Sequence, residues 1–447
     1  MNYFERRNKI YELFGEDFYE KYPLSSRVSN RYIRSKIHYN NLETKNLRLE
    51  YQHNKRLRGL IKDLVYYLLY LLNLSLFRFG RNNQEKILVS PLIFNRFEIL
   101  GKQLKDKYNI CLPLVRRRVH LILKSKARGL IEIDKIIYNK KLQGLLAEVA
   151  EFISKLIDNN NDFNKRILFQ KLDVLENILN EEITKLSKIF KDKRIRLYIS
   201  VFDQVYDDTF NILACQRAGI KTKCIAHAFF AGDIKDETKT NCLPVLADKL
   251  FLWSQEDYDS LKGYEEMEKI RIGGYPKFNK EYIKKMIKKY PQKKIITFFS
   301  TSMFDFDKKW MKEELRIRKK IFNKLKEINE NKGYEIYIRY HGKYEKNIRK
   351  NEKGLLKKCH IKISRNPFIK DVLQSEINLG FGTSCIYEAK ILGKKSFNLF
   401  THTKYDKTFF MKNIEYIDVD DIERKLQEKT DNRPRYDLLM DIDSIIV

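Results

Sequence analysis

Short apolar runs alternate with longer stretches of helical spacing along most of the chain. The first clear run is Lys86–Ser90 (KILVS), which Pro91 closes and which is typical of a strand buried in a parallel sheet. Similar runs predict strands at Ile110–Val115, Arg196–Phe202, Thr222–Ala228, Lys249–Trp253, Ile270–Ile272, Lys294–Phe299, Glu335–Tyr340, Ile361–Ser364, Ile377–Gly380 and Ser396–Phe400. Apolar positions at helical spacing predict helices at Phe97–Lys107, Thr209–Ala218, Glu256–Lys262, Lys308–Glu330, Phe368–Gln374, Cys385–Leu392 and, as the last element, Asp420–Glu428.

Strands that alternate with helices in two successive blocks predict an α/β protein with two Rossmann-like domains that face a cleft. We expect residues 1–85 to be a basic, helical lead-in, residues 86–280 the first domain and residues 281–447 the second. Residues 135–192 have helical spacing that breaks only at Asn159–Asn161, which predicts a helical hairpin inserted in the first domain. Open parallel sheets bind ligands at the carboxyl ends of their strands, so functional side chains are expected there.

The charge balance favours an anionic partner. Lys and Arg outnumber Asp and Glu by 89 to 59, and the formal net charge is +30. This excess suits a phosphorylated substrate, an acidic lipid surface or nucleic acid. Lys and Arg are spread along the whole chain without a nucleic-acid-binding motif, which disfavours the last of these. The apolar window Leu64–Phe77 is too short to span a bilayer, and it predicts either a buried helix or an interfacial segment flanked by basic residues.

Cysteine usage and the amino terminus favour a cytoplasmic protein. The segment Met1–Ile10 is charged and lacks the apolar stretch of a secretory signal. The six cysteines form no CxxC pair, so we expect reduced thiols and no zinc site; they are Cys111, Cys215, Cys224, Cys242, Cys359 and Cys385.

One candidate catalytic residue follows a predicted strand of the first domain. His227 lies in Cys224–Ala228, ahead of a loop that contains Gly232 and Asp233. An imidazole can accept a proton near neutral pH, as attack by an acceptor hydroxyl group requires. A lone histidine is more often structural, so both interpretations remain open on this segment alone.

Two strand ends of the second block carry groups suited to an anion. Arg339, His341 and Lys343 lie within five residues and can donate to a phosphate, although a solvated basic turn is the alternative. The turn Leu379–Ser384 contains two glycines and opens a helix, whose free N–H groups and positive end favour an anion. A simple Thr/Ser helix cap is the alternative there. The turn lacks the spacing of a P-loop or a dinucleotide fingerprint.

The order of these three strand ends resembles that of a known group of transferases. In the CDP-glycerol glycerophosphotransferases and the capsule or lipooligosaccharide sialyl- and Kdo-transferases, all of GT-B architecture, a QHG-like strand end precedes an R-x-HP strand end. A Ser/Thr-Ser-x-x-x-Glu-Ala-x-x-x-Gly-Lys helix then follows. The counterparts here are Ala226–Ala228, Arg339–Gly342 and Thr383–Lys394, and Gly274-Tyr275-Pro276 looks like the crossover before the second domain. Ala226, Ala228 and Gly342 depart from the family pattern, and the resemblance covers roughly residues 195–430.

The resemblance assigns roles to residues of both domains. It implies that Gly382, Thr383 and Ser384 hold the donor phosphate, and that Arg339 and His341 contact the same phosphate. Glu388 corresponds to the family glutamate, which binds the nucleotide ribose in many GT-B enzymes. His227, or a nearby carboxylate such as Asp233, would be the catalytic base. No metal and no cofactor besides the donor are implied.

We therefore expect a bacterial glycosyltransferase that moves a sugar from a nucleotide-activated donor, with a CMP-sugar favoured, to a capsule or lipopolysaccharide glycan. The transfer is expected to invert the anomeric centre without a metal ion. Expected partners are the nucleotide sugar, a glycan or lipid-linked acceptor and an anionic membrane surface, at the inner face of the cell membrane. The alternatives are a CDP-polyol phosphotransferase of the teichoic-acid type, a sugar-nucleotide epimerase and a basic nucleic-acid-binding protein.

Overall fold

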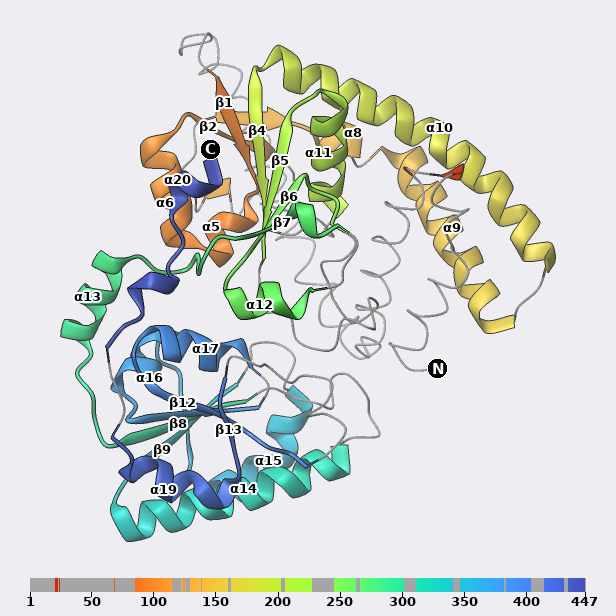
Figure 1. The fold of residues 1–447 in the computed structure, drawn as a ribbon. Helices are drawn as coiled ribbons and strands as arrows, with labels where there is room; N and C mark the ends of the chain where they lie inside the picture. Colours follow the sequence, from red (N-terminus) through yellow and green to blue (C-terminus); the bar gives the residue numbers. More distant parts are fainter. Residues whose placement is uncertain are drawn as a thin grey trace.

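The structure is a computed structural model, and Figure 1 shows its two α/β domains, one above the other. Apart from a few single positions, it describes residues 85–114, 129–137, 139–159, 162–201, 206–226, 245–262, 266–300, 311–340, 346–381, 383–402, 414–429 and 433–446. The predicted sites His227, Asp233, His341 and Gly382 and the apolar window, except Leu68, lie outside these residues.

The first domain is built on a parallel sheet of seven strands in the order β3-β2-β1-β4-β5-β6-β7. Its strands are short and almost wholly buried, as expected where helices cover both faces. The strands are β1 (Lys86–Val89), β2 (Ile110–Leu114), β3 (Gly129–Glu132), β4 (Ile195–Ser200), β5 (Lys221–Ile225), β6 (Lys249–Leu252) and β7 (Ile270–Ile272). The helices are α5 (Leu92–Arg96), α6 (Glu98–Lys107), α8 (Asp134–Ile137), α9 (Lys140–Asn159), α10 (Asp162–Asp192), α11 (Tyr206–Arg217) and α12 (Gln255–Ser260).

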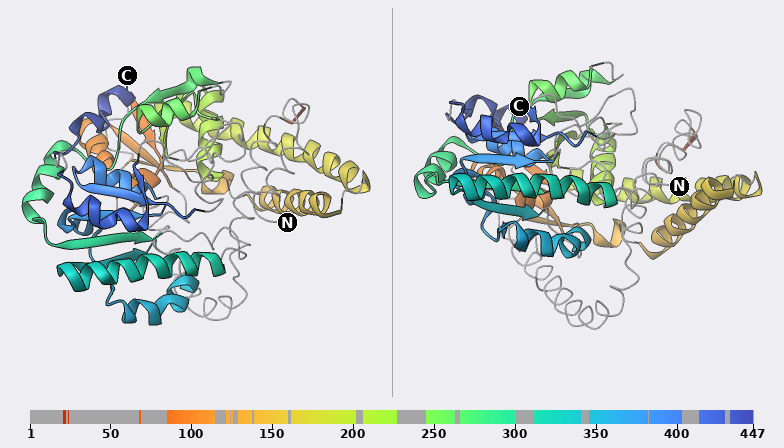
Figure 2. Two further views of the ribbon diagram at one scale, coloured as in Figure 1. Left: turned by 60° about the horizontal axis from the view of Figure 1, so that its bottom comes forward. Right: turned by 90° about the horizontal axis from the view of Figure 1, so that it is seen from below.

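The predicted helical hairpin is confirmed as α9 and α10, which project from the first domain in all three views (Figures 1 and 2). Helix α10 buries Leu172, Leu175 and Leu179 at intervals of three and four residues, which places them on one face. The same helix holds a fragment of the amino-terminal lead-in, because the Tyr22 hydroxyl group donates to Asp173 Oδ1 at 2.9 Å.

The second domain repeats the plan with a six-stranded parallel sheet in the order β10-β9-β8-β11-β12-β13. Helices α16 and α17 cover one side, and α14 and α19 the other (Figure 1). The strands are β8 (Ile295–Ser300), β9 (Glu335–Tyr340), β10 (Lys362–Ile363), β11 (Ile377–Gly380), β12 (Lys395–Leu399) and β13 (Tyr416–Ile417). The helices are α13 (Lys280–Lys289), α14 (Met311–Lys332), α15 (Lys346–Lys358), α16 (Phe368–Gln374), α17 (Ser384–Ile391) and α19 (Ile422–Gln427), and a last helix, α20 (Ile442–Ile446), follows them in the chain.

Both sheets have Rossmann-like order, so the predicted fold class of two such domains, with extra helices in the amino-terminal half, is confirmed. The order reverses between β1 and β4 in the first sheet and between β8 and β11 in the second. Asp420–Glu428 was expected to be the last helix, but α20 follows it and returns to the first domain. There the α20 residue Asp443 accepts hydrogen bonds from Lys107 Nζ (3.0 Å) and the Tyr108 hydroxyl group (2.8 Å).

The chain crosses between the domains twice, and the two crossings lie side by side. Tyr275 in the first crossing donates its N–H to Leu438 O (2.7 Å) and accepts from Met440 N (3.0 Å) in the second. Gly274 has a φ of +86°, and a Cβ there would lie 2.7 Å from a backbone oxygen of the second crossing. Only glycine therefore allows the two crossings to approach this closely.

Replacing Gly274 by Ala should lower the free energy of unfolding by about 2 kcal/mol or more, because the side chain meets backbone and strains a positive φ. Urea unfolding monitored by circular dichroism measures the change. Gly144→Ala in α9 is the matched control, since a Cβ there meets nothing within 4 Å. It should be neutral or stabilise by up to about 1 kcal/mol. Equal effects of the two substitutions would contradict the close-approach argument.

Candidate functional site

The predicted glycine turn joins β11 to α17 at the point where the strand order of the second sheet reverses. Ligands of such sheets bind at this point, outside the carboxyl ends of the strands. Thr383 is the N-cap residue of α17, and its hydroxyl oxygen accepts from Cys385 N at 3.4 Å. Ser384 follows it and is partly exposed. A helix amino end of this kind can accept an anion, because N–H groups of a first turn lack intrahelical partners.

Gly380 lets the strand end lie directly under the helix that follows it. A Cβ at this position would lie 2.6 Å from Ile386 Cγ1 and 2.6 Å from Thr383 Cγ2. A larger residue would push the first turn of α17 away from β11. The glycine therefore sets the position of the cap residue and of the free N–H groups.

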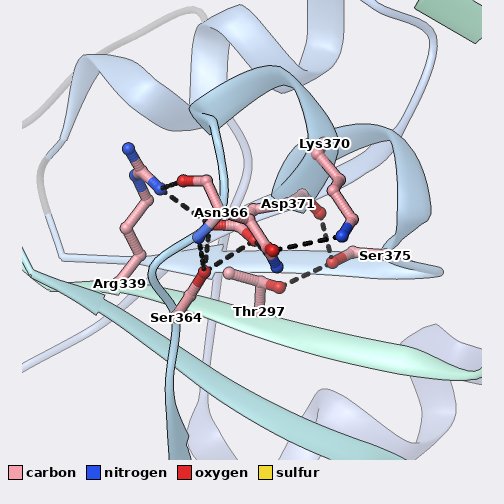
Figure 3. A network of polar contacts seen from close by, with 7 residues as sticks. All are labelled: Thr297, Arg339, Ser364, Asn366, Lys370, Asp371 and Ser375. Atoms are coloured by element: carbon pink, nitrogen blue, oxygen red, sulfur yellow. Dashed lines mark hydrogen bonds and ion pairs between the residues drawn. The ribbon is translucent and has the colours of Figure 1, made fainter. Parts of the chain in front are cut away.

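Arg339, at the end of β9, is held by a network of polar contacts (Figure 3). Its Nη1 donates to Asn366 O (2.7 Å) and to Asp371 Oδ2 (2.8 Å). Asp371 is almost fully buried and also accepts from Ser364 Oγ at 2.7 Å. The other terminal nitrogen of Arg339 points away from this network (Figure 3), and the side chain keeps 28% exposure. The guanidinium group is thus oriented by one edge and open at the other.

Glu388, in the second turn of α17, contacts the first interdomain crossing. Its side chain is 2% exposed and forms an ion pair with Lys277. The Tyr275 ring lies beside it, and the Tyr275 hydroxyl group has no hydrogen bond within the described part of the chain. Burial, followed by the nearby Glu388 carboxylate, raises the pKa of Tyr275. Glu388 therefore joins helix α17 to the crossover.

Four of the predicted site residues come together around Cys385. Burial, followed by the charge of Glu388, raises the pKa of the Cys385 thiol to about 11. The hydrogen bond with Thr383 and the positive charges of Lys277 and Arg339 act in the opposite direction. Arg339, Thr383 and Glu388 are thus neighbours, with Ser384 in the same helical turn. His227, Asp233, His341 and Gly382 are not among the described residues, so their roles remain predictions.

A buried charge network supports the strand ends of the second sheet. Arg318 of α14 is fully buried; its Nε donates to Glu314 (2.8 Å), and its Nη1 lies 3.4 Å from Glu352. Its Nη2 donates to Ser300 Oγ (2.8 Å) at the end of β8. The Tyr340 hydroxyl group, at the end of β9, donates to Glu352.

The Arg318 guanidinium group also lies near the end of β11. It lies 5.9 Å from the ring centre of Phe381, the residue after β11. Burial raises the pKa of Glu352, and the charge of Arg318 opposes this. Arg318 therefore links the ends of β8, β9 and β11, two of which directly precede the predicted site residues His341 and Gly382. The sequence gives no periodic signal for this network.

In the first domain, the strand end before His227 is firmly held. Ala226 N donates to Phe251 O (2.9 Å), and Trp253 Nε1 donates to Ala226 O (2.6 Å). The carboxyl edge of this sheet also approaches the second domain, because the Tyr275 ring lies 5.0 Å from that of Trp253, after β6, and 6.4 Å from that of Tyr387 in α17, measured between ring centres.

A second polar cluster lies where the order of the first sheet reverses. Asp208 accepts from Ser90 Oγ (3.0 Å) after β1 and from the Tyr198 hydroxyl group (2.8 Å) of β4. All three side chains are fully buried. Neither Ser90 nor Asp208 belongs to a recognisable motif, so this carboxylate could not be predicted from the sequence.

Among the described residues, none of the helices has the length and apolar character that a membrane span needs, and no three His, Cys, Asp or Glu side chains lie together as metal ligands would.

Comparison with known proteins gives only distant structural likenesses. No family model and no curated protein matches the chain. Among solved structures, UDP-GlcNAc 2-epimerase from Methanocaldococcus jannaschii is 13% identical, with 78% of this chain and 96% of that chain covered and a TM-score of 0.46. A glycosyltransferase from Rickettsia africae is 14% identical, with coverages of 77% and 88% and a TM-score of 0.44.

The wall teichoic acid polymerase TagF is 12% identical, with coverages of 89% and 92% and a TM-score of 0.38. Because each of these TM-scores is below 0.5, the function proposed below rests on the geometry of this chain.

Replacing Arg318 by Met should lower the free energy of unfolding by about 3–5 kcal/mol, because two buried carboxylates lose their counter-charge. The pKa of Glu352 is raised in the folded protein, so its contribution to stability falls as pH rises above the unfolded value of about 4.3. The loss in the Met variant should therefore be larger at about pH 8 than at about pH 5. Chemical denaturation at both pH values measures it.

The double variant Arg318→Met/Glu352→Gln is the control for the charge effect. It should recover part of the lost stability, because the second substitution removes one uncompensated carboxylate. A loss that is the same at both pH values and in both variants would show that packing, and not charge, dominates at this position.

Proposed function

We propose that this protein is a glycosyltransferase that moves a sugar from a nucleotide-activated donor, with a CMP-sugar favoured, to a bacterial surface glycan. The observation that carries the proposal is the grouping of Arg339, Thr383 and Ser384 at the switch point of the second sheet. A helix amino end, a hydroxyl group and an oriented guanidinium edge together suit a nucleotide phosphate.

The donor would bind across the carboxyl edge of the second sheet. Its phosphate would lie at the amino end of α17, against Gly382, Thr383 and Ser384, with the open edge of Arg339 and the side chain of His341 beside it. Its ribose hydroxyl groups would bind the Glu388 carboxylate. Because Lys277 pairs with Glu388 in this structure, the ribose would share or replace that contact.

The transfer would begin at the strand end of the first domain that precedes His227. His227, or a carboxylate such as Asp233, would accept the proton of the acceptor hydroxyl group. The hydroxyl oxygen would form a bond to the anomeric carbon as the bond from that carbon to the phosphate oxygen breaks, and the electron pair would leave with the phosphate. Attack from the opposite face inverts the anomeric centre. The helix end and Arg339 can stabilise the departing phosphate, so this step requires no metal ion.

A CDP-polyol phosphotransferase would use the same groups with a different bond change. The acceptor oxygen would then attack the phosphorus atom that carries the polyol. The bond from that phosphorus to the bridging oxygen would break, and CMP would leave with the electron pair. The epimerase alternative requires a UDP-sugar in place of a cytidine nucleotide. The nucleic-acid-binding alternative requires no nucleotide donor.

We also propose that the protein works in the cytoplasm at the inner face of the cell membrane, where a lipid-linked acceptor would be found. The net charge of +30 supports attraction to an anionic bilayer.

Replacing His227 by Ala should lower the transfer rate by about 10²–10⁴-fold and leave nucleotide affinity near that of the wild type, because only proton transfer is lost. Replacing Thr383 or His341 by Ala should instead weaken nucleotide binding by roughly tenfold or more, because a hydrogen bond to a charged phosphate is lost. Isothermal titration calorimetry and a radiolabel transfer assay measure the two effects.

The wild-type protein is first screened by thermal shift with CMP, CDP, UDP and GDP. Stabilisation by CMP supports a cytidine donor, because the favoured transfer and the polyol alternative both release CMP. Stronger stabilisation by CDP than by CMP favours the polyol alternative, and stabilisation by UDP alone favours a UDP-sugar, as the epimerase alternative requires. Equal loss of nucleotide binding in all three variants would refute the assigned roles. An oligonucleotide that stabilises the protein when no nucleotide does would refute the transferase.

Replacing Tyr340 by Phe should weaken nucleotide binding by about two- to tenfold, because the hydroxyl contact that ties the end of β9 to Glu352 is lost. Tyr337→Phe is the matched control on the same strand, since its hydroxyl group contacts only the exposed Glu335 at 3.1 Å among the described residues. This variant should keep wild-type affinity. If both variants bind nucleotide equally well, the buried network does not position the donor site.

A further inference from the structure

Helix α13 exposes a dense lysine face directly after the first interdomain crossing. The segment Lys280–Lys294 contains seven lysines and a single acid, Glu281, a net charge of +6 in fifteen residues. The whole chain carries +30 over 447 residues, which is about one charge per fifteen. The central lysines of the helix are all exposed: Lys284, Lys285, Lys288 and Lys289. The side chains that fix the helix to the protein, Ile283 and Met286, lie on its opposite face.

Within the described part of the chain, the charges of this face have no acidic partner. None of the four central lysines forms an ion pair with any residue in the described ranges. Their positions one and four residues apart place them along one side of the helix. Ile287 borders this stripe and keeps 38% exposure, although an isoleucine gains by leaving water. A cationic stripe beside an exposed aliphatic side chain is the pattern of an interfacial helix.

The helix also occupies a position from which it can meet a flat surface. It lies at the outer edge of the molecule in all three views, on the side opposite the α9–α10 hairpin (Figures 1 and 2). The second crossing runs beside it, because Lys280 Nζ lies 5.5 Å from the ring centre of Tyr436. The face is thus attached to both chain segments that join the domains.

We propose that the lysine face of α13 binds the anionic headgroups of a lipid bilayer, with Ile287 inserted at the level of the headgroups. A bilayer fits better than nucleic acid, because all seven cations are lysines and no arginine is present to make bidentate phosphate contacts. Tyr282 and Tyr290 are partly buried against the protein, so the face presents no fully exposed aromatic ring on which bases could stack. The inference locates the membrane contact of the proposed function and requires no transfer activity.

The test is co-sedimentation of the full chain with vesicles of phosphatidylcholine alone or with 30% phosphatidylglycerol. Each lysine near an anionic surface contributes about fivefold to the partition coefficient. The variant with Lys284, Lys285, Lys288 and Lys289 replaced by Gln should therefore bind the anionic vesicles roughly 10²–10³-fold more weakly. Ile287→Ser should reduce binding by up to about tenfold, and this smaller loss should persist in high salt.

The matched control removes four exposed lysines from α15, which lies away from α13 in Figure 1: Lys350, Lys353, Lys357 and Lys358. That helix carries no exposed large apolar side chain among its described residues, and this variant should keep most of its vesicle binding. Equal losses in the two quadruple variants would overturn the proposal, because net charge alone would then explain binding. Three further outcomes would also overturn the proposal. They are equal binding to vesicles of phosphatidylcholine alone, no binding to either kind of vesicle, and an effect of the α13 substitutions on oligonucleotide binding only.

The outcome is separable from that of the proposed function. A protein that binds vesicles through α13 but binds no nucleotide would refute the transferase alone. A protein that binds nucleotide but not vesicles would refute only the membrane contact.

Discussion

The arrangement of this protein depends on the backbone contact between its two interdomain crossings. Tyr275 pairs with the segment at Leu438–Met440, and Gly274 allows the close approach, so the chain that leaves the first domain is tied to the chain that returns. Because α20 then packs on α6, the second domain is attached at both of its ends. A domain held by two adjacent segments has fewer ways to move than one held by a single linker.

Aromatic packing extends this contact into both domains. The Tyr275 ring lies 5.0 Å from that of Trp253 and 6.4 Å from that of Tyr387, measured between ring centres. Trp253 holds the strand end before His227, and Tyr387 belongs to the helix that opens at Thr383. The buried Tyr275 ring thus packs near both Trp253, which holds the strand end before the candidate base, and Tyr387, in the helix of the candidate donor site. Their relative position is set by packing and does not depend on surface ion pairs.

The sequence predicted the sheet cores well where apolar runs were continuous. Ile270–Ile272, Glu335–Tyr340 and Ile377–Gly380 were expected at their observed bounds, because each is a short run closed by glycine or by a polar turn. Strand β3 was missed, since only two of its four residues are fully buried. Helix α13 was missed because lysines fill its sequence, and only Ile283 and Met286 mark its inner face.

The candidate site was partly predictable for the same reason. Arg339 lies at the end of β9, and Thr383 and Glu388 lie at the cap and in the second turn of α17, so their approach at one sheet edge could be expected from strand order. The side chains that orient these residues could not be predicted from strand order. Lys277 meets Glu388 across 111 residues of sequence, and Asp371 meets Arg339 across 32. No periodic pattern encodes such contacts, which arise only when the two sheets and the crossover are assembled.

The pairing of Lys277 with Glu388 has a thermodynamic consequence. The carboxylate is almost fully buried, so a ribose that binds it competes with the ammonium group of the crossover. Two ligands of one group are linked, and each weakens the other by the same factor. When the donor site fills, release of Lys277 would loosen the crossover. Conversely, the site would bind the donor more tightly in a protein whose crossover is already loosened. Donor binding in the second domain would thus make the two domains freer to move relative to each other.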